Sequence, residues 1–389
     1  TSLASSRNCF VLIPRCLSKA ILCAIKGCLI ALRGIVIPKL VNNLILILQV
    51  NTNCIITIKM IIQFYVSLDD LQKNIIMKFG ILGEAKIARE HVVPAIINAG
   101  HEVTVVGRRL PGQTALPAIY GDAIETDYES LISDPSVEAI YNPLPNHLHV
   151  PYSIEALKNN KHVLCEKPVA LNLKELAHLE NAANDSKAFF YEAFMVRSHP
   201  QWQWLQNLDI GNYQSSHFIF SYPKQPEGNV RNLIKYGGGP LFDIGCYAIL
   251  SGCMLFKGEP KVLSAVATMC DQYETEKQVD ATLRWPGGET LSFTVSADAA
   301  LCQSLTVLGS KGWAKLNVPV NPPKQTSAYW SNGGLHEGSH VVFPACNQYQ
   351  LMVEEFVSRS SSGDKSDFLF SKIVTRAIND IQKIAGLKI

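Results

Sequence analysis

The chain has 389 residues, of which 47% are hydrophobic and 17% charged, with a formal net charge of +2. This length is too great for one compact core, so at least two domains are expected. The near-neutral charge gives no electrostatic case for a nucleic-acid partner, and none of the eleven cysteines forms a Cys-x-x-Cys pair, so no metal site is expected.

Residues 1–76 differ in composition from the rest of the chain. Seven Lys and Arg side chains precede the first acidic residue, Asp69, in a background rich in Leu, Ile, Val and Cys. The charge-free run 40–58 is long enough to span a bilayer, but five Asn and Gln residues interrupt it. Three interpretations of this segment are considered: translated upstream sequence outside the working protein, a cleaved targeting segment and a membrane anchor. We expect this extension to lie outside the fold, with no membrane attachment.

From Met77 onward, short apolar strands alternate with helical patterns. Strands are expected at 78–82, 102–106, 139–141, 162–165 and 188–191, and helices at 87–99, 127–132, 150–158 and 173–183. This alternation predicts an α/β Rossmann domain with a doubly wound parallel sheet over residues 77–195.

Beyond residue 195, strand-like segments follow one another with turn signals between them. Strands are expected at 213–222, 261–271, 279–285, 290–297, 305–309 and 314–318, and helices at 243–256, 349–358 and 373–384. This order predicts an α+β domain with an antiparallel sheet over residues 196–389.

A small-residue turn follows the first expected strand. The stretch GILGEAKIA at 80–88 opens a helix directly after that strand, which is the context of a dinucleotide-binding turn. Gly83, Ala85, Lys86 and Ile87 are its candidate cofactor contacts, although alanine replaces the usual second glycine. An ordinary tight turn between strand and helix is the alternative.

Two arginines, Arg108 and Arg109, end the second expected strand. An NAD-selective site usually has an acid at this position, whereas a guanidinium can pair with a 2′-phosphate. The pattern therefore favours NADP, with NAD as the alternative cofactor and a solvated loop as the alternative structure.

Lys167 lies in the tripeptide Glu166-Lys167-Pro168, directly after the strand at 162–165. The carboxyl ends of strands are where ligands bind in open α/β sheets, and the bond before Pro168 is a candidate cis peptide. A lysine beside a nicotinamide can polarise a substrate oxygen or lower the pKa of a neighbour. A surface-loop lysine is the alternative.

Asp243 and Tyr247 lie four residues apart in GGGPLFDIGCY, residues 237–247. This spacing places them on one helix face. An acid and a phenol on one face suit proton transfer to or from an alcohol. A helix-terminal acid followed by a core tyrosine is the alternative.

These motifs, taken with PNHLH, YEAFMVRSHP and NQYQLMVEEF, resemble the Gfo/Idh/MocA oxidoreductase family through nearly the whole of residues 77–389. The sequence is most similar to the dimeric dihydrodiol dehydrogenases and the NADP-dependent D-xylose dehydrogenases. An arginine closely follows EAFM, and tyrosine stands where inositol dehydrogenases have histidine.

The resemblance implies roles for individual residues. Lys167 would be the catalytic lysine, Tyr247 the general acid/base with its pKa lowered by Lys167, and Asp243 its companion. Substrate contacts would come from Arg231, Asp243 and Tyr247. Arg108 would meet the 2′-phosphate of the cofactor and Arg197 would approach the cofactor. The implied cofactor set is Gly83, Ala85, Lys86, Ile87, Arg108, Arg109, Pro145, Asn146, His149, Glu166, Lys167 and Arg197.

The function that the resemblance implies is NADP-dependent hydride transfer between a nicotinamide and a hydroxyl-bearing carbon of a sugar or diol, without a metal. A homodimer formed through an open antiparallel sheet is also implied, and the scattered cysteines are typical of a reducing, cytoplasmic compartment. Residues 110–117 depart from the family, because they leave almost no room for its usual helix. A non-catalytic dinucleotide-binding sensor is the alternative function.

Overall fold

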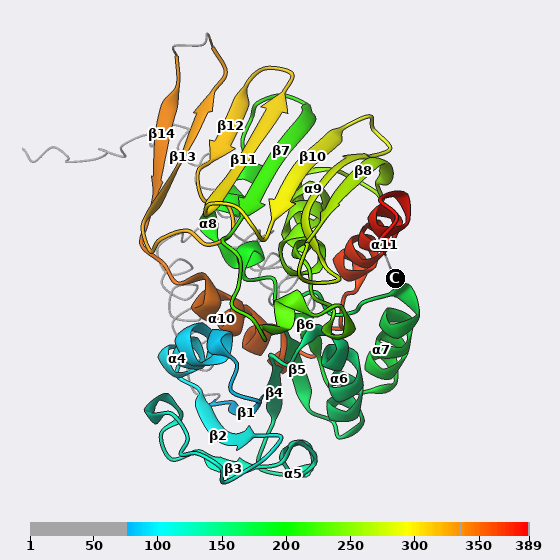
Figure 1. Ribbon diagram of the computed structural model, residues 1–389. Coiled ribbons are helices and arrows are strands. Elements are labelled where there is room, and N and C mark those ends of the chain that lie inside the picture. The colour runs from blue at the N-terminus through cyan, green and yellow to red at the C-terminus, as the bar shows by residue number, and fades with distance from the viewer. Residues whose placement is uncertain (1–75, 334–336, 388–389) are drawn as a thin grey trace, which may run out of the picture. The chain divides into compact units, whose positions relative to one another are not determined.

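The computed structural model describes residues 76–333 and 337–387. Of residues 1–76, the structure describes only the last. The expectations for this segment therefore lie outside the described part of the chain. The prediction of a parallel sheet followed by a second domain with a mostly antiparallel sheet is confirmed (Figure 1).

The first sheet has six strands in the order β3-β2-β1-β4-β5-β6, and every pairing is parallel. Its strands are β1 Lys78–Leu82, β2 Glu102–Gly107, β3 Ile124–Thr126, β4 Ala139–Asn142, β5 His162–Cys165 and β6 Phe190–Glu192. The strand order reverses between β1 and β4, and such a switch point opens a crevice at the carboxyl ends of the strands.

Helices connect the strands of this sheet. A π-helical turn at Ala88–Val92 leads into α4 Val93–Asn98, and the others are α5 Tyr128–Ser133, α6 His149–Lys158 and α7 Leu173–Asp185. Asp127 and Asn172 cap α5 and α7 by accepting backbone N–H bonds at 2.7 and 2.9 Å, as short polar side chains do at helix starts. Between β2 and β3 there is only a loop and a 3-10 turn, Ala118–Tyr120, as expected for a segment without room for a helix.

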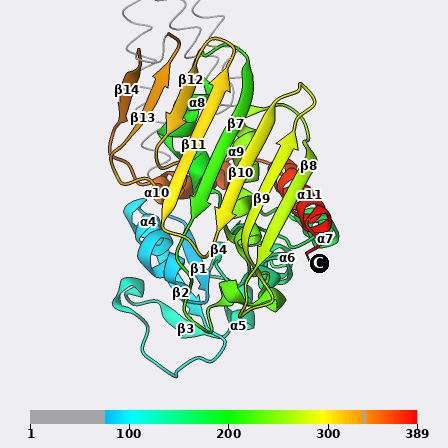
Figure 2. The ribbon, with the colours of Figure 1, turned by 45° about the horizontal axis from the view of Figure 1, so that its top comes forward.

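The second sheet has eight strands in the order β14-β13-β12-β11-β7-β10-β9-β8 (Figure 2). They are β7 Tyr213–Ser221, β8 Lys261–Met269, β9 Glu276–Arg284, β10 Thr290–Ser296, β11 Cys302–Gly309, β12 Trp313–Leu316, β13 Thr326–Ser331 and β14 Ser339–Phe343. Within this mostly antiparallel sheet, β7 and β10 run parallel. Turn signals reveal hairpins such as β9–β10, but not which strand a hairpin then joins.

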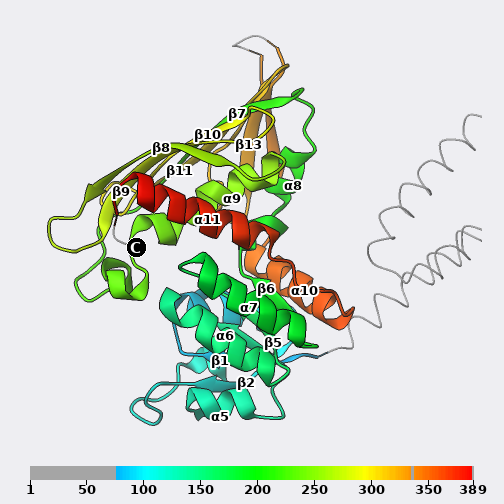
Figure 3. The same cartoon turned by 90° about the vertical axis from the view of Figure 1, so that its right-hand side faces the viewer.

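Helices cover one face of this sheet. These are α9 Cys246–Leu255 and α11 Leu369–Ile384, which Figure 3 shows lying along the sheet. The other helices of this region are α8 Pro200–Gln206 and α10 Gln348–Ser361, of which α10 packs against α4. The opposite face carries exposed apolar side chains, among them Ile219 and Leu308. In the described chain, only the segment Ile234–Leu255 has the length and hydropathy to cross a membrane, and 83% of it is buried as a core helix would be.

One apolar cluster extends through both sheets. Phe356 of α10 packs against Phe79 of β1 with 5.9 Å between ring centroids, so a helix late in the chain rests on the first strand of the parallel sheet. Trp202 is buried and its indole N–H donates to the Pro319 carbonyl at 2.8 Å. This packing brings the carboxyl ends of the parallel strands next to the start of α9.

Candidate active site

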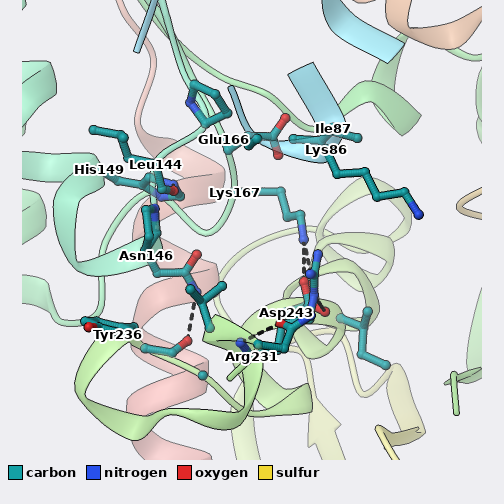
Figure 4. A pocket seen from close by; sticks show the side chains of 18 of the residues that line it. Lys86, Ile87, Leu144, Asn146, His149, Glu166, Lys167, Arg231, Tyr236 and Asp243 are labelled. Carbon is teal, nitrogen blue, oxygen red and sulfur yellow. Dashed lines mark hydrogen bonds and ion pairs between the residues drawn. The ribbon is translucent and has the colours of Figure 1, made fainter. Parts of the chain in front are cut away.

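A cavity of about 900 Å³ lies between the turn after β1, the loop after β5 and the start of α9. Figure 4 shows side chains from these three places converging on it. Most of the residues predicted from sequence line it, namely Gly83, Ala85, Lys86, Ile87, Pro145, Asn146, His149, Glu166, Lys167, Arg231, Asp243 and Tyr247.

Asp243 is the centre of the charged group in this cavity. The Lys167 ammonium donates to the Asp243 carbonyl oxygen at 2.6 Å and to its Oδ1 at 3.2 Å. Arg231 donates from Nε to Oδ2 of the same carboxylate at 2.7 Å, and both cations point toward it (Figure 4). The peptide bond between Lys167 and Pro168 is cis, as the sequence indicated.

The charge state of this group follows from its contacts. Burial alone would raise the pKa of Asp243, but Arg231 and Lys167 hold that pKa well below its ordinary value. Burial would lower the pKa of Lys167, but Asp243 outweighs burial and the pKa is raised. The group formed by Asp243, Lys167 and Arg231 therefore holds one carboxylate and two cations at neutral pH, a net charge of +1 before the neighbouring Glu166 is counted. This charge favours an oxygen that gains negative charge.

Tyr247 lies beside this group with a different environment from the one predicted. Its hydroxyl contacts the Met195 sulfur at 3.2 Å, and the Lys167 ammonium lies 4.9 Å from the ring centroid, over the face of the ring. Burial and then the charge of Glu166 raise the pKa of Tyr247 well above its ordinary value. The prediction that Lys167 lowers this pKa is therefore wrong for this structure, because the ammonium faces the ring and Asp243 rather than the phenol oxygen.

Asp243 and Tyr247 were predicted on one α-helical face. Asp243 instead belongs to a π-helical turn, Leu241–Gly245, and Tyr247 to the first turn of α9. Both side chains still line the cavity. A π-helical turn inside a helix commonly accompanies a functional site.

The residues after β4 and β5 shape the cavity wall. Glu166 accepts a hydrogen bond from the Tyr141 hydroxyl at 2.7 Å, and burial raises its pKa. The ring nitrogens of His149 lie 2.9 and 2.6 Å from the carbonyl oxygens of Pro168 and Leu144, and burial lowers the His149 pKa to about 4. A neutral imidazole has one N–H, so His149 donates to only one of these two carbonyls. His149 thus packs between the loop after β4 and the loop that carries Lys167.

Asn146 joins the two parts of the cavity. Its amide donates to the Gly237 carbonyl at 2.8 Å (Figure 4). Next to it, Tyr236 stacks on His147 with 4.8 Å between ring centroids. The loop before α9 is therefore held against the loop after β4.

Arg108 does not line the cavity, and its prediction as a 2′-phosphate ligand needs correction. Its Nε and one terminal nitrogen donate to Glu84, the other terminal nitrogen donates to Glu125 at 2.9 Å, and Thr114 accepts from both terminal nitrogens. A guanidinium has five N–H groups, so these five hydrogen bonds use all of them. Arg108 therefore holds the loop that replaces the expected helix, with no donor left for a phosphate.

The other two predicted arginines also lie outside the lining of the cavity. Arg109 is exposed. Burial raises the pKa of Tyr128, a lining residue, and the positive charge of Arg109 acts against that rise, so Arg109 lies near this lining residue. The Arg197 guanidinium instead packs over the rings of Phe370 and Tyr191, at 5.2 and 5.4 Å. The structure thus directs Arg197 away from the cavity.

Sequence reasoning missed several aromatic and apolar lining residues. They are Tyr128, Met195, Phe220, Tyr222, Tyr236 and Tyr349. Tyr222 is the last residue of a predicted strand, and that position at a strand end is the signal that could have marked it as a lining residue. Burial and then the charge of Asp243, which lines the same cavity, raise the pKa of Tyr222.

The turn after β1 fits a dinucleotide phosphate. Gly83 has φ +79°, in the left-handed region, and a Cβ there would lie 3.3 Å from a Leu144 methyl carbon. A glycine turn without a side chain lets backbone N–H groups approach an anion. In residues 76–333 and 337–387, no cluster of three or more His, Cys, Asp or Glu is arranged to hold a metal ion.

Comparison with known proteins shows the family of this chain. Residues 77–194 match the oxidoreductase family with an NAD-binding Rossmann fold, and residues 202–315 match the GFO/IDH/MocA C-terminal domain. The chain is 32% identical over 325 residues to an uncharacterised oxidoreductase of Rhizobium meliloti, covering 80% of this chain and 97% of that one. The chain belongs to the Gfo/Idh/MocA oxidoreductase family.

Other members of the Gfo/Idh/MocA family have more specific descriptions. The D-xylose 1-dehydrogenase (NADP(+)) 2 of Haloferax volcanii is 29% identical over 79% of this chain and 97% of its own length. A 3-ketoreductase from Actinomadura kijaniata, solved with NADP and TDP-benzene, is 25% identical with a TM-score of 0.73, covering 80% of this chain and 98% of that one. The chain is thus an oxidoreductase of this family.

Glu192 supports the loop of this Gfo/Idh/MocA chain that carries Lys167 from behind. It is buried, and its carboxyl oxygens accept hydrogen bonds from the Val169 backbone N–H at 2.9 Å and from the Ser371 hydroxyl at 2.5 Å. Burial raises its pKa from 4.5 to about 7. Between these two values the folded protein keeps a proton that the unfolded chain releases, so this group lowers the free energy of unfolding as pH rises through that window.

We therefore expect Glu192→Gln, which cannot titrate, to gain stability relative to wild type as pH rises. Urea unfolding at pH 4.5 and pH 8 should show the difference between variant and wild type shifting by up to about 3 kcal/mol in favour of the variant at pH 8. A difference that is the same at both pH values would contradict the raised pKa.

Proposed function

We propose that the protein is an NADP-dependent dehydrogenase that transfers hydride between the nicotinamide and a hydroxyl-bearing carbon of a sugar or diol. The observation that carries this proposal is the contact of the Lys167 ammonium with Asp243 and with the Tyr247 ring, in a cavity that also includes the turn after β1. The proposed acid–base groups and the turn proposed to bind the dinucleotide line one cavity, which supports such a reaction.

The residues that would hold the cofactor come mainly from the parallel sheet. The turn at Gly83 and Ala85 would hold the pyrophosphate at the start of the following helix, and Arg109 and Tyr128 would face the adenosine ribose. Glu166 and Asn146, which line the deeper cavity, would face the nicotinamide end. When bound, the nicotinamide supplies the hydride acceptor or donor.

Lys167 would bind the substrate oxygen. An ammonium has three N–H groups, and Asp243 accepts from it through two oxygens, so a third N–H remains for a ligand. Because the pKa of Lys167 is raised, the group stays charged and stabilises negative charge on that oxygen. Asp243 and Arg231 keep the lysine in place.

Tyr247 would move the proton. Its hydroxyl contacts a thioether sulfur, which is a weak acceptor, so a substrate oxygen can replace that contact at little cost. With its pKa raised by burial, the resting phenol is protonated and donates a proton when a carbonyl is reduced. Oxidation of an alcohol runs the same transfer in reverse.

The lining of the cavity supports a sugar or diol as the substrate. Phe220, Tyr222 and Tyr236 offer apolar ring surface, while Asn229 and Arg231 offer polar groups. This combination suits a compact molecule with several hydroxyl groups. The xylose dehydrogenase relative supports the same class.

The test is nicotinamide reduction by the full-length chain, followed by absorbance, with NADP or NAD against D-xylose, D-glucose and a cyclic trans-diol. We expect turnover with NADP and at least one of these substrates. Tight NADPH binding without turnover on sugars or diols would contradict the proposed activity, and the absence of dinucleotide binding would contradict the proposed cofactor.

A further inference from the structure

The turn after β1 contains an acid that the proposed mechanism does not use. Glu84 directly follows Gly83 and lines the cavity. Its Oε1 accepts from Arg108, including an Nε bond at 3.2 Å. Its Oε2 is buried, with no hydrogen-bond partner among the described residues. A buried carboxylate oxygen without a partner is costly unless a ligand supplies the missing donor.

The charges around Glu84 do not balance. Arg108 is shared between Glu84 and Glu125, and the second ion pair measures 2.9 Å. Two carboxylates on one guanidinium leave a net charge of −1. Because all five Arg108 N–H groups are used within the protein, this group offers a phosphate no donor and opposes it by charge.

This group lies where a Rossmann domain distinguishes its two cofactors. Arg108 follows the last paired residue of β2, Gly107, and the adenosine ribose binds at the end of that strand. An acidic side chain there accepts a hydrogen bond from the ribose 2′-hydroxyl of NAD, whereas an arginine pairs with the 2′-phosphate of NADP. Here the acid comes from the neighbouring turn, and the exposed Arg109 is the arginine that remains available.

We propose that Glu84 is a cofactor-selectivity residue. Its carboxylate, on a side chain that is 29% exposed and lines the cavity, accepts a hydrogen bond from the ribose of NAD and repels the 2′-phosphate of NADP, so that NAD competes with NADP despite Arg109. This inference rests on the proposed dinucleotide site and adds to it a residue outside the strand end that usually decides selectivity.

The test compares two isosteric charge removals in the full-length chain. Glu84→Gln keeps an oxygen for Arg108 but removes the charge that faces the cavity. Glu125→Gln removes a charge from the same group, at a residue that does not line the cavity. Calorimetric titration with NADP+ and with NAD+ gives the ratio of the two dissociation constants for each protein.

We expect Glu84→Gln to shift this ratio toward NADP+ by about tenfold, through tighter NADP+ binding and weaker NAD+ binding. We expect Glu125→Gln to shift it by less than about threefold, and Glu84→Ala to repeat the direction of Glu84→Gln. An unchanged ratio, or equal tightening of both cofactors, would overturn the role of Glu84. Failure of the wild-type chain to bind either dinucleotide would overturn the proposed function itself, and this inference with it.

Discussion

Replacement of Lys167 by methionine should lower kcat/KM by roughly a thousandfold. Methionine fills similar space but removes the ammonium that contacts Asp243 and the face of the Tyr247 ring. Without it, negative charge on the substrate oxygen loses its nearest donor. The dissociation constant for the dinucleotide should stay within about threefold of wild type, because the turn after β1 is untouched.

A matched control for this variant is Lys174→Met, at an exposed position on α7. Steady-state kinetics of the two variants, in the direction that the substrate screen identifies, measure the effect. A Lys167→Met enzyme that keeps more than about a tenth of wild-type kcat/KM would contradict the catalytic role of Lys167.

Replacement of Tyr247 by phenylalanine should lower kcat by roughly a hundredfold or more. The ring and its packing remain, and only the proton-carrying hydroxyl is lost. Because that hydroxyl contacts only the Met195 sulfur among the described residues, we expect the free energy of unfolding to change by no more than about 1 kcal/mol. A large loss of activity in a normally stable protein would then report on chemistry rather than on folding.

The pH profile gives this variant a second readout. The wild-type rate of alcohol oxidation should rise with pH, because burial raises the pKa of Tyr247 and its phenolate is the proton acceptor in that direction. Tyr247→Phe should lose this rise. Tyr120→Phe is the matched control, since Tyr120 is buried, has no hydroxyl partner in the described chain and does not line the cavity. A pH profile unchanged in Tyr247→Phe would rule out its proton-transfer role.

The elements that could be predicted from sequence are those with a strong local pattern. The strand β5 was predicted with its observed bounds, and β1 likewise, because their apolar residues are flanked by turn signals. The strands β3, β13 and β14 were missed. At three to six residues each, at or near the edges of the two sheets, they carry little apolar pattern.

In the candidate site, too, local motifs could be recognised in the sequence, whereas contacts between distant residues could not. The motifs around Lys167 and Asp243 marked both residues, but their hydrogen bond joins positions 76 residues apart, which only the fold brings together. The role of Arg108 depended on Glu84 and Glu125, which are 24 and 17 residues away. Two adjacent arginines in a sequence do not indicate which of them forms its hydrogen bonds within the protein.

The bond between Lys167 and Asp243 also joins two parts of the molecule. Lys167 follows β5 of the parallel sheet, whereas Asp243 precedes α9 beneath the large sheet. A hinge movement that separated these two parts would break this bond. On the proposed mechanism, Lys167 and Asp243 would then have to come together again before the next substrate could react.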